Sequence, residues 1–214
     1  MATYKEIKGV TIQTLDEDPV QNVGSWSSGA DTNTNRYSAV GYGLTNSAAG
    51  VVGGYDGSNP TANNEYYDGS SWSEQSDLNT ARAYMGGSGS QTSALIFGGD
   101  ARPANPTVPV TNVESWNGSA WSETTEMNTS VAEGYGAGIS NSAIISAGGR
   151  ITPYPTTTNQ VESWNGSSWT EVNDLNTARR YMGSAGIQTS ALAFGGGAPP
   201  TKIASTESWD GTSW

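Results

Sequence analysis

Arginines recur at one position of this sequence, where their spacing could serve chemistry. Arg36, Arg82 and Arg179 each stand three residues after the Asn of a repeated acid-x-Asn-Thr segment, whereas the third copy has Val131 there, with Glu133 nearby. The repeated acids are Asp31, Asp77, Glu126 and Asp174. Such groups in register can tie neighbouring units by bidentate pairing, or can form a charged ring that binds an anion or a sugar. Because residues shared by the copies normally serve the repeat, we favour the structural interpretation.

The chain lacks the side chains of most catalytic and metal sites. It has no Cys and no His among 214 residues, which excludes Cys nucleophiles, thiolate or imidazole metal ligands and the commonest general base. We therefore expect no enzyme, no metal and no cofactor. A formal net charge of -11 with only nine Lys and Arg disfavours nucleic-acid binding. We also expect no signal peptide and no membrane insertion, since no apolar run has the required length.

A tryptophan hairpin organises the chain. Residues 113–121 read V-E-S-W-N-G-S-A-W, and related copies recur along the sequence. Asn-Gly or Asp-Gly between aromatic runs is typical of a tight hairpin with a type I′ turn. The second Trp of each copy, together with an earlier Trp, gives intervals of 46, 49, 48 and 45 residues between Trp26, Trp72, Trp121, Trp169 and Trp214. We expect these five to pack between neighbouring units. The first Trp of each hairpin, at Trp116, Trp164 and Trp209, is expected to lie nearer an outer rim and to be partly exposed.

Each repeat contains four predicted antiparallel strands. The first is rich in Gly, as at 82–89, the second ends in Gly-Gly, as at 93–99, and the Trp hairpin supplies the third and fourth. Gly-Gly closing the second strand and Trp opening the fourth resemble the kelch repeat from about residue 24 onward. This resemblance implies an all-β protein folded as a β-propeller, in which each blade is a four-stranded sheet.

Four blades with a short N-terminal extension are our prediction for the architecture. The extension covers 1–23 and the propeller 24–214, with blades at about 33–74, 79–123, 128–171 and 176–214. Ring closure has alternatives. Residues 24–31 can supply the closing strand of the last blade, the segment ending at Trp214 competes for that place, or the ring stays open and completes itself with another chain.

A narrower resemblance concerns kelch-repeat proteins encoded by tailed phages of marine bacteria. The opening A-T-Y-K-E-I-K-G at 2–9, the Asp-Pro at 18–19 and the repeated L-N-T-A-R and Q-T-S-A-L phrases carry it. The resemblance implies a bacteriophage virion or tail fiber protein that acts outside the cell. It also implies attachment to other virion proteins through 1–23.

Variable loops are the expected binding surface. In an up-and-down blade, the loops between second and third strands share one face, and they differ in length and content from copy to copy. Loops on a rigid scaffold are the usual place for recognition, although unconstrained drift would look the same. The candidate binding residues are Tyr55, Asp56, Asn59, Asp100, Arg102, Asn105, Arg150, Tyr154 and Lys202.

Host attachment by recognition of a surface glycan or protein is the function that we expect from this pattern. One alternative is a structural protein that decorates or cements a capsid or tail, and a homo-oligomer is compatible with either role. Another alternative is a glycan-active enzyme, because the Ser-x-Asn/Asp-Gly-x-x-Trp hairpin is similar to the aspartate box of sialidases. It is, however, one residue shorter. Kelch-type copper oxidase chemistry is excluded by the lack of Cys and His.

Overall fold

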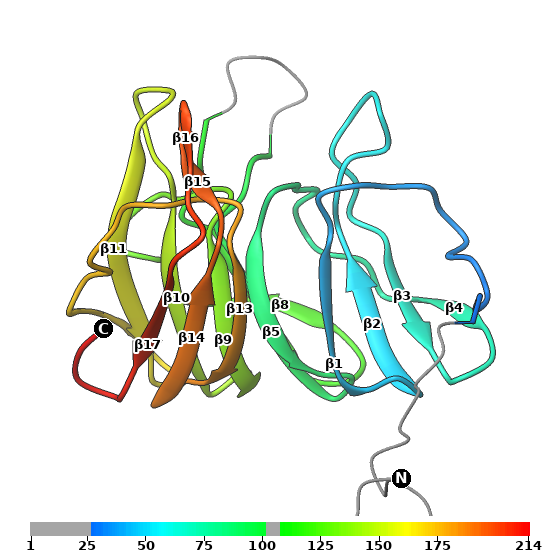
Figure 1. Ribbon diagram of the computed structural model, residues 1–214. Helices are drawn as coiled ribbons and strands as arrows, with labels where there is room; N and C mark the ends of the chain where they lie inside the picture. The colour runs from blue at the N-terminus through cyan, green and yellow to red at the C-terminus, as the bar shows by residue number, and fades with distance from the viewer. Residues whose placement is uncertain (1–26, 102–107) are drawn as a thin grey trace, which may run out of the picture.

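The computed structural model describes residues 27–101 and 108–214. In these residues all regular structure is β-strand, and small antiparallel sheets form the four blades of a β-propeller (Figure 1). This confirms the predicted fold class. The extension at 1–23, Trp26, Arg102 and Asn105 lie outside the described residues. Within the described part of the chain, no helix is long and apolar enough to cross a membrane.

Blades 1 to 3 each contain four strands in sequence order. Blade 1 consists of β1 (Val40–Thr45), β2 (Ala48–Val52), β3 (Asn64–Tyr67) and β4 (Trp72–Gln75). Blade 2 consists of β5 (Gly86–Ser90), β6 (Ser93–Phe97), β7 (Val113–Trp116) and β8 (Trp121–Glu123). Blade 3 consists of β9 (Tyr135–Ser140), β10 (Ala143–Arg150), β11 (Thr157–Trp164) and β12 (Trp169–Val172).

Blade 4 departs from the expected four strands. Its sheet consists of β13 (Gly183–Ile187), β14 (Ser190–Phe194) and β17 (Thr206–Trp209). A separate two-stranded ribbon, β15 (Gly197–Ala198) and β16 (Thr201–Lys202), forms the connection between β14 and β17. Trp214 lies where the other blades begin their fourth strand, and its ring packs against that of Trp209 with 5.4 Å between centroids.

Facing residues on the two inner strands of a blade compensate each other in size, because a large side chain on one strand faces a small residue on the other. In blade 2, Gly86 faces Phe97, and a Cβ on this glycine would lie 2.4 Å from the phenyl ring. In blade 3 the sizes are reversed, because Tyr135 faces Ala147. The Gly-rich character of the innermost strand is therefore partly a response to the large residue on the strand beside it.

A ladder of main-chain hydrogen bonds joins the blades near the propeller axis. The residue two positions before each inner strand has a left-handed backbone, with φ values of 54°, 57°, 59° and 53° at Ser38, Tyr84, Glu133 and Tyr181. The N–H of Tyr84 donates to the carbonyl of Ser38 at 3.0 Å, Glu133 donates to Tyr84 at 2.8 Å, and Tyr181 donates to Glu133 at 3.2 Å. Because the left-handed backbone is uncommon for residues other than Gly, its recurrence shows that this contact is part of the repeat.

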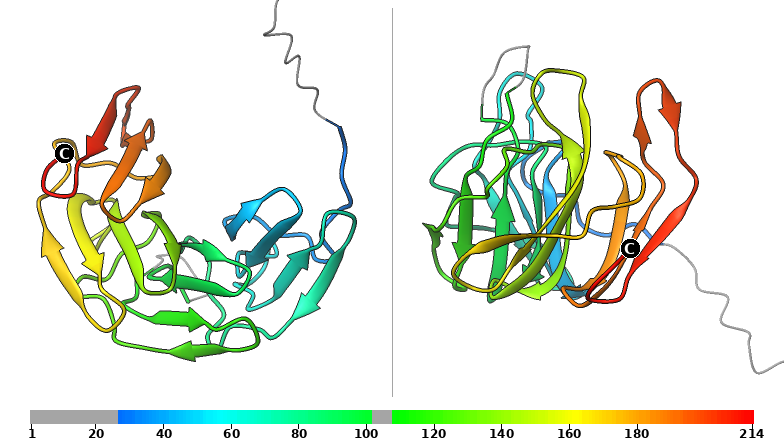
Figure 2. Two further views of the ribbon diagram at one scale, coloured as in Figure 1. Left: turned by 90° about the horizontal axis from the view of Figure 1, so that it is seen from below. Right: turned by 90° about the vertical axis from the view of Figure 1, so that its left-hand side faces the viewer.

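The four blades form an open arc, and blade 4 does not return to blade 1 (Figure 2). Residues 27–31 do not close it, since they form no strand and lie beside blade 1, where the indole N–H of Trp72 donates to the carbonyl of Ala30 at 3.1 Å. Of the alternatives for ring closure, a closing strand from 24–31 is therefore not formed within the described residues. The loops between second and third strands, with the linkers between blades, define the loop face, and the Trp hairpins define the opposite hairpin face.

The buried tryptophans are only partly those that the sequence indicates. Trp121 and Trp169 are buried as expected, at 5% and 6% exposure. The expectation of an exposed rim is wrong for Trp116 and Trp164, which are 0% and 1% exposed. Each donates its indole N–H to a backbone carbonyl of the nearest turn, at 2.8 Å in both blades. Trp209 is also buried and donates at 2.9 Å. A satisfied N–H lets an indole be buried completely.

The hairpin turn also differs from the predicted type I′ turn. Trp116 pairs with Trp121, so four residues form the loop, and only Gly118 has a positive φ. The side chain of Asn117 accepts hydrogen bonds from the backbone N–H groups of Ser119 and Ala120 at 2.9 and 3.0 Å. An Asx side chain thus closes the turn in place of a left-handed backbone at the first position.

Candidate functional site

The recurring arginines are structural ties within single blades. Arg82 is fully buried, and its guanidinium donates to Glu114 Oε1 at 3.0 Å and to the Asn112 carbonyl at 2.9 Å. The same pairing joins Arg36 to Glu65 and Arg179 to Glu207. Burial lowers the pKa of Arg82, and the Glu114 carboxylate opposes this shift. The partners are therefore glutamates of the third strand, and the linker acids do not take this role in the described pairs.

The charged ring of the alternative interpretation, with Arg36, Arg82, Arg179 and Glu133, is not formed. Each arginine is tied into its own blade, so it cannot take part in a shared anion site. Glu133 lies instead in a second charged cluster, where its carboxylate accepts from Arg150 Nε at 2.9 Å and from Arg180 at 2.7 Å. Arg150 also lies 4.0 Å from Asp100 of the preceding blade. This cluster joins blades 2, 3 and 4 on the loop face.

Tyr154 covers the two arginines of this cluster. Its ring centroid lies 5.7 Å from the guanidinium carbon of Arg150 and 5.8 Å from that of Arg180. Tyr154 as a whole is 61% exposed. A cation under an aromatic ring is held by the ring quadrupole, and the outer ring face remains available to a ligand. Of the predicted binding residues, Asp100, Arg150 and Tyr154 therefore come together around Glu133.

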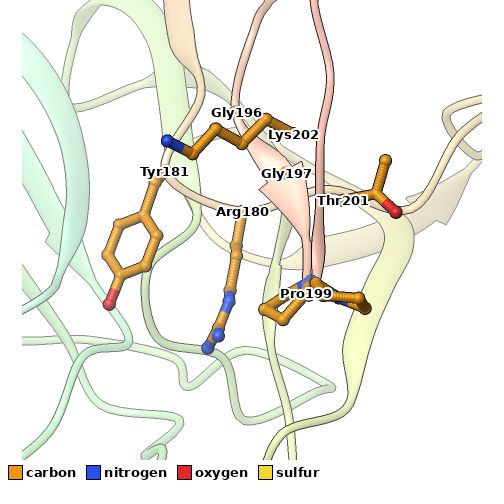
Figure 3. Close-up of a pocket in the computed structure, with 8 residues that line it drawn as sticks. Arg180, Tyr181, Gly196, Gly197, Pro199, Thr201 and Lys202 are labelled. Carbon is orange, nitrogen blue, oxygen red and sulfur yellow. The ribbon is translucent and has the colours of Figure 1, made fainter.

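A pocket of about 410 Å³ opens beside this cluster (Figure 3). It is lined by Arg180, Tyr181, Gly196, Gly197, Pro199, Pro200, Thr201 and Lys202. The Arg180 side chain lies between the Tyr181 ring and Pro199, and Lys202 extends toward Tyr181 (Figure 3). The ribbon of β15 and β16 forms one wall, and its two prolines make that wall apolar.

The polar groups of the pocket are cationic or neutral donors. Arg180 uses one terminal nitrogen for Glu133, while its buried Nε has no hydrogen-bond partner among the described residues. Lys202 adds an exposed ammonium group. Burial raises the pKa of Tyr181, and the charge of Glu133 and a hydrogen bond to it raise this pKa further. A pocket with an aromatic face, prolines and cationic donors suits a small anionic ligand with an apolar side.

The predicted residues of blade 1 serve their own loop. Asp56 accepts hydrogen bonds from the backbone N–H groups of Ser58 and Asn59, both at 2.7 Å. Tyr55 donates its hydroxyl to the Ser58 carbonyl at 2.8 Å and packs on Tyr37 with 5.4 Å between centroids. These contacts make the loop rigid. The structure thus brings Lys202 to the pocket and Arg150 with Tyr154 to its side, but it leaves Tyr55, Asp56 and Asn59 in a separate loop.

Sequence reasoning missed most of the residues that line the pocket. Arg180 is the clearest case, because the equivalent positions hold Tyr37, Ala83 and Ala132, each paired by an isolated bridge to the same loop position. An arginine at a position that is small or aromatic in the other copies was the available signal. Tyr181, in contrast, cannot be distinguished from its equivalent Tyr84 by sequence alone.

The described residues contain no group of three or more acidic side chains arranged to hold a metal ion. A second hollow of about 350 Å³ lies on the propeller axis, between the inner strands of all four blades. Glycines contribute much of its wall, so it presents few side chains to a ligand. No protein-family model matches the chain, and no curated protein has a significantly similar sequence.

Proposed function

We propose that the protein is a non-enzymatic binding protein whose loop-face pocket recognises an acidic saccharide of a host surface. The observation that carries the proposal is the combination of Lys202, Arg180 and the Tyr181 ring around one pocket of about 410 Å³. Aromatic rings stack on the apolar face of a sugar, and cationic donors pair with a carboxylate or sulfate by charge-assisted hydrogen bonds. The formal net charge of -11 would repel acidic ligands elsewhere on the protein.

The proposed setting is the particle of a tailed phage, with residues 1–23 attached to other virion proteins. The resemblance of the repeated phrases to phage-encoded kelch proteins supports this setting. Deletion of 1–23 separates ligand binding from attachment to the particle. A receptor-binding protein keeps its ligand affinity without the arm and loses only its place on the particle. Electron microscopy of labelled particles should locate the full chain on the tail or capsid, and its absence from particles would contradict the proposed setting.

The binding proposal is tested with the isolated full chain on an array of acidic and neutral saccharides. We expect binding to carboxylated or sulfated sugars and none to their neutral counterparts. Lys202→Gln should weaken this binding about tenfold or more, since hydrogen bonds to charged groups contribute about 1.5–3 kcal/mol. Tyr181→Ala should weaken it as well through the loss of the ring face.

Ile139→Ala is the matched control, because Ile139 is 53% exposed but lies at the opposite, hairpin face. It should bind as the unaltered chain does. Preference for neutral sugars, or equal affinity of the Lys202→Gln variant, would contradict the proposal. Release of free sugar from a bound saccharide would instead show a glycan-active enzyme.

A decoration or cement protein is the second candidate, favoured by an exposed apolar face on blade 4. Leu192 and Phe194 are 43% and 41% exposed there. In this role the full chain would bind particles that carry no host saccharide, and the Lys202→Gln variant would bind them equally well.

A further inference from the structure

The face of blade 4 that points away from blade 3 is apolar and is not covered by any of the residues that the structure describes. Leu192 and Phe194 are 43% and 41% exposed. Their equivalents in blade 2, Leu95 and Phe97, are both 0% exposed, because they pack in one cluster with Trp169 and other residues of blade 3. The same residue types thus form a closed interface in blade 2 and an open one in blade 4. We call the latter the open face of blade 4, defined by Leu192, Phe194, Thr206 and Ser208.

Among the residues that the structure describes, main-chain groups at this face also lack the partners that their equivalents have. The N–H of the second Gly in each Gly-Gly pair donates to the next linker: Gly54 to Arg82, Gly99 to Val131 and Gly149 to Arg179, at 2.8, 2.8 and 2.9 Å. Within the described residues, Gly196 N–H makes no such bond and the carbonyl of Tyr181 accepts none. A further blade would supply both partners.

Blade 1 carries the complementary set, which is likewise unused in the described residues. By repeat equivalence, Arg36 offers the carbonyl that Gly196 lacks, and Ser38 offers the N–H that Tyr181 lacks. The preceding face of blade 1 presents Ala49 and Val51, both half-buried. In blade 3, Ile144 is one of the residues that cover Leu95 and Phe97, and it is larger than Ala49 or Val51. Blade 1 therefore matches this cover only in part.

A side-chain contact repeats in the same manner on the hairpin face. Gln91 of blade 2 donates to the Tyr67 carbonyl of blade 1 at 2.9 Å, and Asn141 of blade 3 donates to the Trp116 carbonyl of blade 2 at 3.1 Å. Gln188 of blade 4 makes the same bond to Trp164 of blade 3. The equivalent donor in blade 1 is Asn46, which is exposed, and the equivalent acceptor in blade 4 is the carbonyl of Trp209.

We propose that a second copy of this chain docks its blade 1 against the open face of blade 4, head to tail. The second copy is the occupant because its blade 1 offers the acceptor, the donor and the side-chain contact that this face lacks. Such an interface is heterologous, so two copies close a ring if the rotation permits and longer open assemblies form if it does not. The arc of Figure 2 is open on the side where this partner would enter.

Docking would add a residue to the pocket described above. Arg150 reaches Asp100 of the preceding blade at 4.0 Å. The position equivalent to Arg150 in blade 1 is Tyr55, and the position equivalent to Asp100 in blade 4 is Gly197, which lines the pocket. Tyr55 of the second copy would therefore lie beside Gly197, at the edge of the pocket.

The first test uses the absence of Cys, which makes every introduced thiol unique. Asn46→Cys and Ser208→Cys are prepared as separate variants, mixed, and treated with a short bismaleimide. We expect a product of twice the 22.2 kDa chain mass from the mixture and from neither variant alone. A double variant Ser115→Cys, Asn141→Cys is the control, because these side chains are 2.8 Å apart across blades 2 and 3 and should join within one chain.

Three outcomes of this test overturn the proposal. Products from one variant alone show a symmetric interface, and an intrachain product of an Asn46→Cys, Ser208→Cys double variant shows that the chain closes on itself. The lack of any product from the mixture, with the control joined, shows that this face does not receive blade 1.

The second test measures mass by analytical ultracentrifugation. We expect the full chain to sediment as a dimer or larger assembly, and to do so more strongly as salt screens its net charge of -11. Phe194→Asp should sediment as a monomer, and its melting temperature should match that of the unaltered chain at a concentration where the latter is monomeric. Ile139→Asp, altered at a residue that is 53% exposed, should behave as the unaltered chain. A monomeric full chain overturns the proposal. This holds also if deletion of 1–26 produces a dimer, because that segment would then be what occupies the open face of blade 4 in the full chain.

Discussion

Blades 2 and 4 are close copies in sequence, yet they differ in what their side chains do. Leu95 and Phe97 of blade 2 are fully buried, whereas Leu192 and Phe194 of blade 4 are more than 40% exposed. The strands have the same register, so the difference comes from the presence or absence of a following blade. Each blade therefore contributes only half of an interface, and hydrophobic residues in the repeat are stabilising only where a neighbour covers them.

The largest difference is expected from removal of the phenyl ring. Phe97→Ala should lower the free energy of unfolding by about 3–5 kcal/mol, because it leaves a cavity between two blades. Phe194→Ala should lower it by less than about 1 kcal/mol in the monomer, where the ring is already partly in water. Urea denaturation at a concentration that keeps the chain monomeric measures both. Equal effects would show that the two rings are equally covered in solution.

A smaller difference is expected from the buried ion pairs. Glu114→Gln leaves the Arg82 charge buried without its partner, which should cost about 3–5 kcal/mol in the free energy of unfolding. Glu207→Gln should cost less, because Glu207 is 9% exposed and Glu114 only 1%. Because Glu207 is more exposed, water can approach the Arg179 guanidinium in the Glu207→Gln variant. Thermal or urea unfolding of the two variants gives the ranking, and a larger loss for Glu207→Gln would contradict the assignment.

The smallest effect concerns the hairpin turn, where blade 2 has Asn117 and blade 4 has Asp210. Hydrogen bonds from Thr212 and Ser213 lower the pKa of Asp210 to about 2. Because the folded pKa lies below the unfolded value of about 3.9, the stabilisation is present above pH 3.9 and is lost as the pH falls through about 2. Asp210→Asn should flatten the dependence of unfolding on pH in this window. Asn117→Asp should steepen it.

Acid unfolding monitored by tryptophan fluorescence, together with carboxyl NMR titration of Asp210, checks this expectation. An ordinary pKa for Asp210, or identical acid midpoints for the variants and the unaltered chain, would show that the Asx hydrogen bonds do not persist in solution.

The sequence was sufficient for the architecture because the period is a local, repeated signal. Gly-Gly pairs, Trp spacing and variable loops predicted four blades and a face that carries diversity, and the blades are confirmed. The partners of the arginines were not predicted, because Glu114 and its equivalents lie on a different strand, far along the chain. The sequence did contain a signal for these partners, since a charged residue recurs in the third strand of each blade, two residues before its aromatic residue.

Other features depended on neighbours that the sequence does not identify. The burial of Trp116 follows from the blade packed beside it and from a carbonyl placed to accept its N–H. The turn at Asn117 depends on a competition between backbone conformation and side-chain hydrogen bonding, and both solutions use the same Asn-Gly pair. Arg180 became significant only when the fold placed it beside Glu133 and the pocket.

The left-handed ladder near the axis has a consequence for protein engineering. Ser38 and Tyr84 take part in this ladder through main-chain atoms, so the ladder makes no demand on the chemistry of their side chains, whereas the Glu133 carboxylate also holds Arg150 and Arg180. Three different residue types already occupy these sites. Ser38 and Tyr84 are therefore natural positions for randomisation in a display library, with Asn, Asp and Gly as the substituents that tolerate this backbone best. Selected variants would acquire new binding specificities near the propeller axis, while the framework that carries them stays the same.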